Sequence, residues 1–554
     1  MSKIRIFALG GLDEDGKNMF VVEIDDGIFI LECGLKYPQG DQLGVEMIIP
    51  DFTYLKENEK RIKGIFITHG HDDVMAALPS LMKVIKAPIY TAPLTAVLLE
   101  KRFKKEGIKK YEIHRIKRNG SFKIDKYKIK TFGVTQSIMD GFGLGILTDH
   151  GYIVYTSEYI VDYDIKNEAF RGNLSEITKI GNEGVLALLT ESVGSTREGH
   201  SAPKHRITSI IEPSFEDTNN RIIVTLYNQN IYRIIEVIEL AVKYGRKICF
   251  FDDELKQMMM DIEKLGYYHV PVNAEIAKNK FNNDDENVVV IISGSGSNIF
   301  KRVHKIAIKE DAQLEFRETD TIIIASPMVP GTEHEATKME NDLYKEGAKV
   351  VAVDSKRAYS MHAAIEDLKM MLYLFNPSYY VPVKGEYRQL VSNANIALDM
   401  GYKADHIIVL DNGQIATIED GILSKHYDML QLEDVMIDGK DNLDSSGMVL
   451  KDREILSTDG VIVAGVVVNY RTKQIIGGPD VQSRGVIYLK DADYVMKEVG
   501  VMFEEIINTA VKEKRYDNMS CRQEAREKIA RYVFKETGKK PMILPAIVEI
   551  NIKD

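Results

Sequence analysis

THGHDDVMAALPSLM, residues Thr68–Met82, directly follows the apolar run RIKGIFI and opens into a predicted helix. His69 and His71, two positions apart, and Asp73, two further on, therefore project from a tight turn between a strand and a helix. Imidazole and carboxylate groups in such an arrangement are typical ligands for a hard or borderline cation. The spacing predicts a metal site; the alternative is a set of solvated polar residues on a loop.

The rest of the chain has the composition of a large globular protein. Its 554 residues are 44% apolar and 28% charged, with 40 glycines and 15 prolines, which excludes collagen-like, low-complexity and wholly disordered classes. The length suggests about three domains. The net charge of -11 argues against a protein that coats nucleic acid through its overall charge, although a local basic groove is compatible with it.

Cysteine usage and hydropathy bear on the cellular compartment. The three cysteines are odd in number and far apart, which indicates neither a disulfide framework nor a cysteine zinc cluster and fits a reducing cytosol. The longest apolar stretch, near Val461 to Val468, is much shorter than the ~20 residues that a membrane span needs. We therefore expect a cytoplasmic chain with no export signal and no membrane anchor.

The pattern of strands and helices changes along the chain. Residues 1–205 contain short β-branched runs separated by Gly and Asp turns. From Arg206 to Asp354, strands alternate with helices as in a doubly wound α/β domain. A later strand pair, punctuated by Asn412-Gly413 and Asp420-Gly421, resembles the first region again. This order predicts one domain inserted within another, followed by a linker and a final unit of strands and helices.

The segment Thr68–Met82 resembles the H-x-H-x-D-H signature of hydrolases with the metallo-β-lactamase fold. Other segments resemble, in order, those of the ribonuclease J family in the β-CASP branch: GGLDEDGKN, LECGLKYP, IIPDFTYL, RIIVTLYNQNIYRI, PVKGEYR, GGPDVQSRG and KKPMILPAIVEI. The resemblance covers nearly the whole chain. It implies an α/β fold in which an αββα metallo-β-lactamase sandwich is interrupted by a doubly wound β-CASP domain and followed by a small C-terminal α/β domain.

The resemblance also implies domain boundaries and an activity. The metallo-β-lactamase domain is expected in two parts, residues 1–205 and 355–430, with the β-CASP domain, residues 206–354, between them. A linker, residues 431–450, and the C-terminal domain, residues 451–554, are expected to follow. Members of the family are 5'-to-3' exoribonucleases and endoribonucleases of ribosomal RNA maturation and messenger RNA turnover. Within the family, the chain is most similar to the degenerate second paralogue that accompanies a fully equipped enzyme.

Members of the family hold two metal ions that activate a water for phosphodiester hydrolysis. His69, His71 and Asp73 match the first three ligands of the signature, but Val74 stands where the family has a histidine. An isopropyl group has no lone pair to donate. Gln136, in the segment VTQSIMDGFG, replaces the next ligand histidine, and its amide oxygen is a poorer partner for zinc than imidazole.

Two more ligand positions depart from the family. Glu158 in TSEY stands in place of the bridging aspartate, and Lys384 in PVKGEYR replaces the last ligand histidine. We expect the Lys384 ammonium to lie near Asp73 and Glu158 and to offset their charge; the alternative is a lysine that points to solvent. The second metal position has thus lost two of its four ligands, whereas the first keeps a weakened set: His69, His71, Gln136 and Glu158.

Two segments match parts of the family that hold substrate phosphates. In the loop SGSGSN, residues Ser293–Asn298, backbone amides at Gly294 and the Ser295 hydroxyl are suited to a phosphate, although such a loop alone is more often a surface turn. In AYSMHAAIEDLK, Ser360 and His362 match the S-G-H motif, and the alternative for His362 is a partly exposed histidine at the start of a helix.

A basic segment offers a further candidate for RNA contact. KRFKKEGIKKYEIHRIKR, residues Lys101–Arg118, carries nine Lys and Arg residues with Phe103 and Tyr111 between them. Such a segment is able to line an RNA path electrostatically. The alternative, which the pattern favours, is a solvated helix face on which Glu106 and Glu112 pair with the cations.

We expect weak or absent hydrolysis, because a site without two correctly held metals supplies neither the nucleophile nor leaving-group stabilisation. The favoured interpretation is a non-catalytic RNA-binding subunit that partners an active ribonuclease J paralogue, forms a homodimer when alone and joins an RNA-degradation complex. It would hold one weakly bound zinc or manganese ion, or none. The alternative is a feeble ribonuclease with Asp73, as general base, and His362 as catalytic candidates. A thioester or lactam hydrolase shares the signature but lacks the inserted domain.

Overall fold

The computed structural model of the protein describes residues 2–38, 42–329, 331–439, 441–442, 448–486 and 492–551. The chain separates into two compact units: Met1–Pro38 with Glu46–Val435, and Gln39–Val45 with Met436–Asp554. Residues 440 and 443–447 of the predicted linker lie outside the described residues. The expected boundaries between the individual domains stay predictions.

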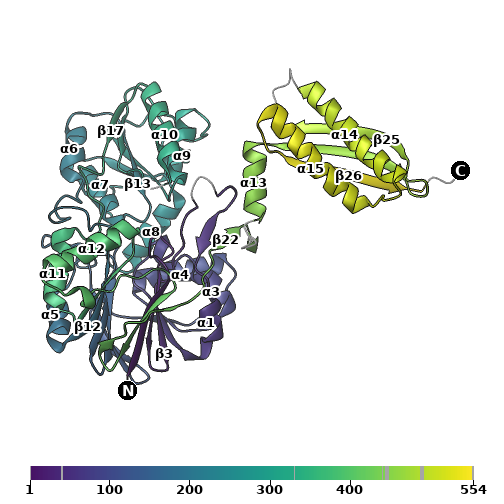
Figure 1. Ribbon diagram of the computed structural model, residues 1–554. Coiled ribbons are helices and arrows are strands. Elements are labelled where there is room, and N and C mark those ends of the chain that lie inside the picture. The colour runs from purple at the N-terminus through teal and green to yellow at the C-terminus, as the bar shows by residue number, and fades with distance from the viewer. Residues whose placement is uncertain are drawn as a thin grey trace. The chain divides into compact units, whose positions relative to one another are not determined.

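Two sheets of the first unit enclose a shared core (Figure 1). Phe20 and Phe29 of one sheet pack in this core with Ile129 and Leu144 of the other. The first sheet has the order β20 (Ile422–Leu423), β19 (Gln414–Glu419), β1 (Lys3–Gly10), β2 (Met19–Ile24), β3 (Gly27–Leu31), β5 (Ile62–Ile67), β6 (Ile89–Thr91), β7 (Ile113–Arg115), with β21 (Asp428–Met429) beside β19. The second has the order β18 (Tyr379–Val383), β12 (Val185–Glu191), β11 (Gly151–Tyr155), β10 (Phe142–Thr148), β9 (Tyr127–Gly133), β8 (Gly120–Ile124).

Helices cover the outer faces of both sheets (Figure 1). On the second sheet, Leu368 and Ile396 pack against Leu188 and Tyr380. Strands that are covered on both faces read as continuous apolar runs, and the six residues of β2 are all buried. The arrangement confirms the αββα sandwich. The helices are α1 (Thr53–Glu57), α3 (Leu78–Val84) and α4 (Pro93–Lys105) on the first sheet, and α5 (Leu174–Glu183), α11 (Ile365–Phe375) and α12 (Tyr387–Asp399) on the second; β4 (Met47–Ile49) precedes α1.

A third sheet forms the inserted domain. Its parallel strands have the order β14 (Lys247–Phe250), β15 (Val288–Gly294), β13 (Ile222–Tyr227), β16 (Thr321–Ile324), β17 (Lys349–Ala352). One face packs against α6 (Thr208–Glu216), α7 (Ile231–Lys243) and α8 (Asp253–Lys264), and the other against α9 (Asn298–Ala307) and α10 (Glu333–Lys345). Helices on both faces confirm the predicted doubly wound domain.

The chain returns to the sandwich after this domain. β18 pairs in parallel with β12, which places Val381 opposite Leu189. β19 pairs antiparallel with β1, which places Ala416 opposite Ile6. Both sheets of the sandwich therefore contain strands from before and after residues 206–354, which confirms the predicted insertion. The same return brings Lys384, directly after β18, to the end of a strand of the second sheet.

The second unit is a sheet with helices on one face. Its strands have the order β25 (Ile475–Arg484), β24 (Val461–Asn469), β26 (Met542–Ile550), and α14 (Ala492–Lys512) and α15 (Asn518–Thr537) share a core with them. Burial alternates along β24, as expected for a sheet covered on one face. Other elements of the region are β22 (Val435–Asp438), β23 (Asp441–Asn442) and α13 (Met448–Thr458). Across the described residues, none of the helices combines the length and apolar character that crossing a bilayer requires.

A fully buried ion pair offers a test of the inserted domain. Arg221, directly before β13, donates from Nε to Asp320 Oδ1 at 3.0 Å and from Nη2 to Oδ2 at 2.6 Å. Arg221→Met leaves this buried carboxylate with the Arg317 guanidinium, at 3.6 Å, as its remaining cation, and we expect the free energy of unfolding in urea to fall by about 3 kcal/mol. Adding Asp320→Asn removes the second charge and should recover most of that loss. Wild-type stability of the single variant would contradict this account.

Candidate active site

The segment Thr68–Met82 forms the predicted turn, with β5 before it and α2 (Asp72–Met75) within it. His69 Nε2 lies 3.1 Å from His71 Nδ1. Glu158, beyond the end of β11, places Oε1 3.4 Å from His69 Nε2 and Oε2 3.5 Å from His71 Nδ1. One possible ligand atom from each of these residues lies within 4.8 Å of the others. The tertiary fold thus adds a carboxylate to the histidine pair.

Hydroxyl groups hold the outer nitrogens of both imidazoles. Thr68 Oγ1 and Ser157 Oγ lie 2.9 Å and 3.3 Å from His69 Nδ1, and Ser137 Oγ lies 3.0 Å from His71 Nε2. Burial lowers the pKa of His71 to about 4 and the pKa of His69 well below its usual value. Both rings are therefore neutral at pH 7, so that each is able to offer a lone pair to a cation.

The predicted ligand Gln136 is buried directly before Ser137. Neither its Oε1 nor its Nε2 has a hydrogen-bond partner among the described residues. A buried polar group without a partner costs about 1–3 kcal/mol, so this amide oxygen is suited to an external partner. The imidazoles of His69 and His71 and the carboxylate of Glu158 form a donor set that fits one divalent cation, and the part of Gln136 in it stays a prediction.

A lysine stands at the second ligand position. Lys384 has a φ of +53° and is buried, with 3% of its surface exposed. Its Nζ donates to Asp73 Oδ2 at 2.6 Å and also contacts Glu158 Oε1. Burial raises the pKa of Asp73, but the Lys384 ammonium outweighs this effect and holds the pKa far below its usual range. The buried Val74 adds only hydrocarbon. This environment does not fit a second cation.

His362 lies in the same cavity as His71, Asp73 and Glu158. His362 Nδ1 is 2.6 Å from Glu191 Oε2 and 4.0 Å from Glu158 Oε2. Burial lowers the pKa of His362, but the Glu191 carboxylate overcomes this effect and raises it. Ser360 accepts a hydrogen bond from Arg197 Nη1 at 2.6 Å. The cavity, of about 270 Å³, joins residues from far apart in the chain: His71, Asp73, Glu158, Ser360, His362 and Lys384.

Gly294 and Ser295 line a different cavity, of about 360 Å³, at the end of β15. The structure therefore does not place them in one cavity with Ser360 and His362. Asp252 also lines the second cavity, and its Oδ2 accepts a hydrogen bond from the Ser293 N–H at 2.6 Å. The Asp252 carboxylate therefore already accepts the hydrogen bond of one backbone N–H in this loop, which is then not free to bind a phosphate. Phosphate binding at Gly294 and Ser295 stays a prediction.

The basic segment Lys101–Arg118 makes many internal contacts. Lys101 pairs with Asp261, and Arg102 with Asp72. Arg118 is directed inward and donates to the backbone carbonyls of residues 134, 141, 168 and 171. Cations of the segment thus have structural partners, but not the predicted ones, since Glu106 pairs with Lys83 and Glu112 with His114.

Several polar residues of the site, among them Asn18, Asp15 and Ser137, carry no assigned role in the sequence analysis. Asn18 donates from Nδ2 to Asp73 Oδ2 at 3.0 Å and to the Asp73 backbone carbonyl at 2.9 Å. Asp15 lines the cavity, and its pKa is raised, mainly by burial. Ser137 holds His71, as described above. Asp15 and Asn18 belong to the segment GGLDEDGKN. The sequence feature that could have identified them as site residues is the resemblance of that segment, because their spacing is not that of metal ligands.

Comparisons with known proteins agree along the whole chain. Family models match residues 12–185 (metallo-beta-lactamase superfamily), 219–343 (ribonuclease J, beta-CASP domain) and 448–550 (ribonuclease J C-terminal domain). Proteins named ribonuclease J 2 from Staphylococcus epidermidis and Staphylococcus saprophyticus are 32% and 31% identical over 99% of this chain and 98% of theirs. A crystal structure of a protein of unknown function from Enterococcus faecalis covers 75% of this chain and 100% of its own, with a TM-score of 0.52 and 15% identity, which shows the fold alone.

Glu32 yields a testable pH dependence. Directly after β3, it accepts a hydrogen bond from the Thr68 N–H at 3.0 Å. Burial raises the pKa of Glu32 to about 8, whereas an unfolded glutamate titrates near about 4.3. As the pH rises, Glu32 therefore loses its proton at a lower pH in the unfolded chain than in the folded one. Its contribution to the free energy of unfolding is complete below about pH 4 and decreases as the pH rises to about 8.

Glu32→Gln keeps the shape of the neutral acid and should remove this decrease. We expect the variant to exceed the wild type in free energy of unfolding at pH 8 by on the order of a few kcal/mol, and to match it near pH 4. Urea denaturation across that pH range measures both curves. Parallel curves for the two proteins would contradict a raised pKa at Glu32.

Proposed function

Because the chain belongs to the ribonuclease J family, we propose that it works in RNA processing and decay as the partner of an active ribonuclease J. Its own nuclease activity is weak or absent. The roles that fit are ribosomal RNA maturation and messenger RNA turnover in the cytoplasm. The curated relatives named ribonuclease J 2, matched from end to end, support this assignment.

One observation carries the proposal: the Lys384 ammonium contacts both Asp73 and Glu158. The buried carboxylate of Glu158 and the partly buried one of Asp73 need a compensating cation, and the Lys384 side chain supplies it. Asp73 is then an ion-paired carboxylate with a lowered pKa. Such a group is a weak general base, because a good one needs a pKa near the working pH.

The first metal position retains His69, His71, Gln136 and Glu158 as the residues that would hold one zinc or manganese ion. When bound, this ion would polarise a phosphate oxygen and lower the pKa of a bound water. The side chains of this chain would orient the phosphate: His362 lies in the same cavity, held by the Glu191 carboxylate, which raises its pKa, and is a candidate contact for that phosphate. Ser360 and, from the second cavity, Gly294 and Ser295 are further candidates for RNA phosphates.

The intact cluster of His69, His71 and Glu158 favours a second candidate function, a feeble ribonuclease that uses one ion. In that case Asp73 and His362 are the catalytic residues. A metal bound at a single position leaves either the attacking or the leaving oxygen without its cation. Both candidate functions involve RNA, and they differ in how fast this chain itself cleaves it.

The C-terminal unit is suited to assembly. The sheet face opposite α14 and α15 exposes apolar side chains, including Val463 at 41%, Leu544 at 41% and Val548 at 54%. Contiguous exposed apolar surface is typical of protein interaction sites. We assign this face to self-association of the chain alone, to pairing with an active ribonuclease J and, through that pair, to a larger RNA-degradation complex.

Metal content tests the ligand assignment. We expect the purified chain to hold at most one equivalent of zinc or manganese by inductively coupled plasma mass spectrometry. Restoring the family ligands with Val74→His, Gln136→His and Lys384→His should raise this toward two, because the second position regains its donors. Lys384→Met is the matched control: it removes the ammonium without adding a ligand, so it should gain no second ion. Failure of the triple variant to gain metal would count against the assignment.

Nuclease assays separate the two candidate functions. On 5'-monophosphorylated RNA with manganese or zinc, we expect cleavage at least about a hundredfold slower than that of a family member with all its ligands. Any residual activity that belongs to this chain must disappear in His69→Ala and Asp73→Ala. Activity equal in wild type and variants points to a contaminating nuclease and leaves the partner role as the function. Wild-type activity comparable to that of an intact member would contradict the proposal.

A further inference from the structure

Arg233, in the first turn of α7, is a buried cation in the cavity of His362 and Lys384. It is 3% exposed and lines that cavity from the inserted domain. Its Nη2 donates to the backbone carbonyls of His205, at 3.3 Å, and Tyr359, at 2.8 Å. Nε is buried without a partner, and Nη1 has no acceptor among the described residues. The protein therefore uses only one of the three guanidinium nitrogens in the part of the chain that the structure describes.

The charge of this guanidinium is poorly compensated. Burial lowers the pKa of Arg233 and the Glu236 carboxylate raises it, but an arginine stays protonated in proteins. Glu236 forms hydrogen bonds elsewhere: its Oε1 accepts from Thr208 Oγ1 at 2.6 Å and from the Ile207 N–H at 3.1 Å. A buried charge without a paired counter-ion is costly. The cavity is therefore suited to an anion that comes from outside the protein.

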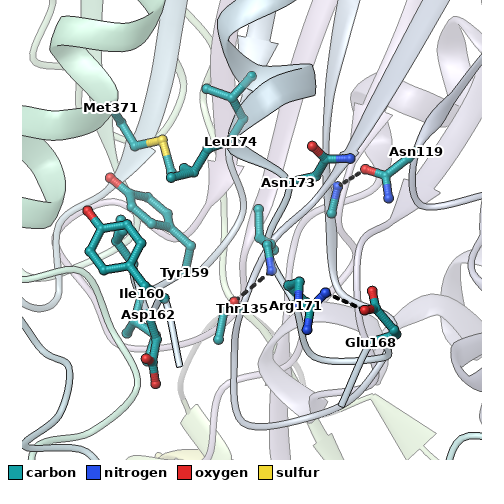
Figure 2. A pocket seen from close by; sticks show the side chains of 16 residues that line it. Asn119, Thr135, Tyr159, Ile160, Asp162, Glu168, Arg171, Asn173, Leu174 and Met371 are labelled. Atoms are coloured by element: carbon teal, nitrogen blue, oxygen red, sulfur yellow. Dashed lines mark hydrogen bonds and ion pairs between the residues drawn. The ribbon is translucent and has the colours of Figure 1, made fainter. Parts of the chain in front are cut away.

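Other cations near the site are satisfied within the protein. Arg118 uses all three of its guanidinium nitrogens, on four backbone carbonyls. Arg171, in a separate cavity of about 470 Å³, contacts the Glu168 carboxylate (Figure 2). The Lys384 ammonium, in the same cavity as Arg233, is paired with two carboxylates. Arg233 differs from these groups because it combines a place in the cavity with unused donors and no ion pair.

The start of α7 adds to the positive character around Arg233. Asn230, the N-cap of this 13-residue helix, also lines the cavity, and its side-chain oxygen accepts the Arg233 N–H at 3.1 Å. The N-terminus of a helix carries a partial positive charge and favours anions. A guanidinium prefers an anion with several acceptor oxygens, such as a phosphate. The inserted domain thus presents phosphate-binding chemistry to the cavity that also holds His71 and Glu158.

We propose that Arg233 binds a backbone phosphate of RNA in this cavity. The inference rests on the proposed function, which makes RNA the polyanion that enters the cavity. It adds a cation of the inserted domain to the candidate contacts Ser360 and His362. The phosphate would supply the counter-ion that the protein does not provide, and the guanidinium would hold the strand in place. Arg233 is thus a binding residue, and no reacting atom is assigned to it.

Fluorescence anisotropy of a short single-stranded, 5'-monophosphorylated RNA with the full chain in EDTA tests the inference without cleavage. We expect Arg233→Met to raise the Kd by about tenfold or more and to reduce the salt slope of log Kd by about 0.7, the share of one phosphate contact. Arg233→Lys keeps the charge and should keep the wild-type slope. Arg246→Met is the matched control: Arg246 is buried and donates to backbone carbonyls but does not line the cavity, so the Kd should not change.

A second variant leaves the carbonyl contacts of Arg233 in place. Asn230→Asp keeps a good N-cap and the oxygen that accepts the Arg233 N–H, so it should fold normally. Its carboxylate competes with a phosphate for the guanidinium and should weaken RNA binding by about tenfold or more. Asn173→Asp makes the same change at the N-cap of α5, in the separate cavity (Figure 2), and should bind RNA as the wild type does.

The outcomes distinguish this inference from the function on which it rests. If Arg233→Met and Asn230→Asp both bind RNA as their controls do, the inference is overturned while RNA binding by the chain stands. If the wild type binds no RNA, the proposed function falls together with the inference. Inorganic phosphate that binds the wild type more tightly than RNA does, and does not bind Arg233→Met, would also overturn it, since the site would then hold a free anion.

Discussion

The contact of one buried ammonium with two carboxylates determines what the candidate active site is able to do. Asp73 and Glu158 converge because the turn after β5 and the segment after β11 meet at the same end of the sandwich. Burying Glu158 and partly burying Asp73 beside it is costly unless a cation accompanies them. In this chain Lys384 is that cation. The same carboxylates are therefore committed to a side chain and are poorly disposed toward a second metal ion.

The neutral half of the site keeps a different character. His69 and His71 are held by hydroxyl groups and uncharged by burial, and the amide of Gln136 has no partner within the described residues. The two imidazoles, together with the Glu158 carboxylate, suit one cation. A scaffold with one position suited to metal and one occupied by lysine is the basis of the proposal that this member of the family keeps the fold while its own hydrolysis is weak or absent.

Much of this follows from the sequence, for identifiable reasons. The β-branched alternation of residues 206–354 predicts the doubly wound domain, and the Thr68–Met82 signature predicts the turn of the site. The expected neighbourhood of Lys384 matches the contacts in the structure. The pairing of His362 with Glu191 and the separation of Gly294 from Ser360 were not accessible, because such distances depend on how segments more than sixty residues apart pack together.

An anomalous-scattering map of crystals grown with manganese tests the central claim most directly. The account predicts no peak between Asp73 and Glu158, where density for the Lys384 side chain should stand, and at most one peak beside His69 and His71. Two peaks bridged by the Glu158 carboxylate, with Lys384 turned away, would contradict it.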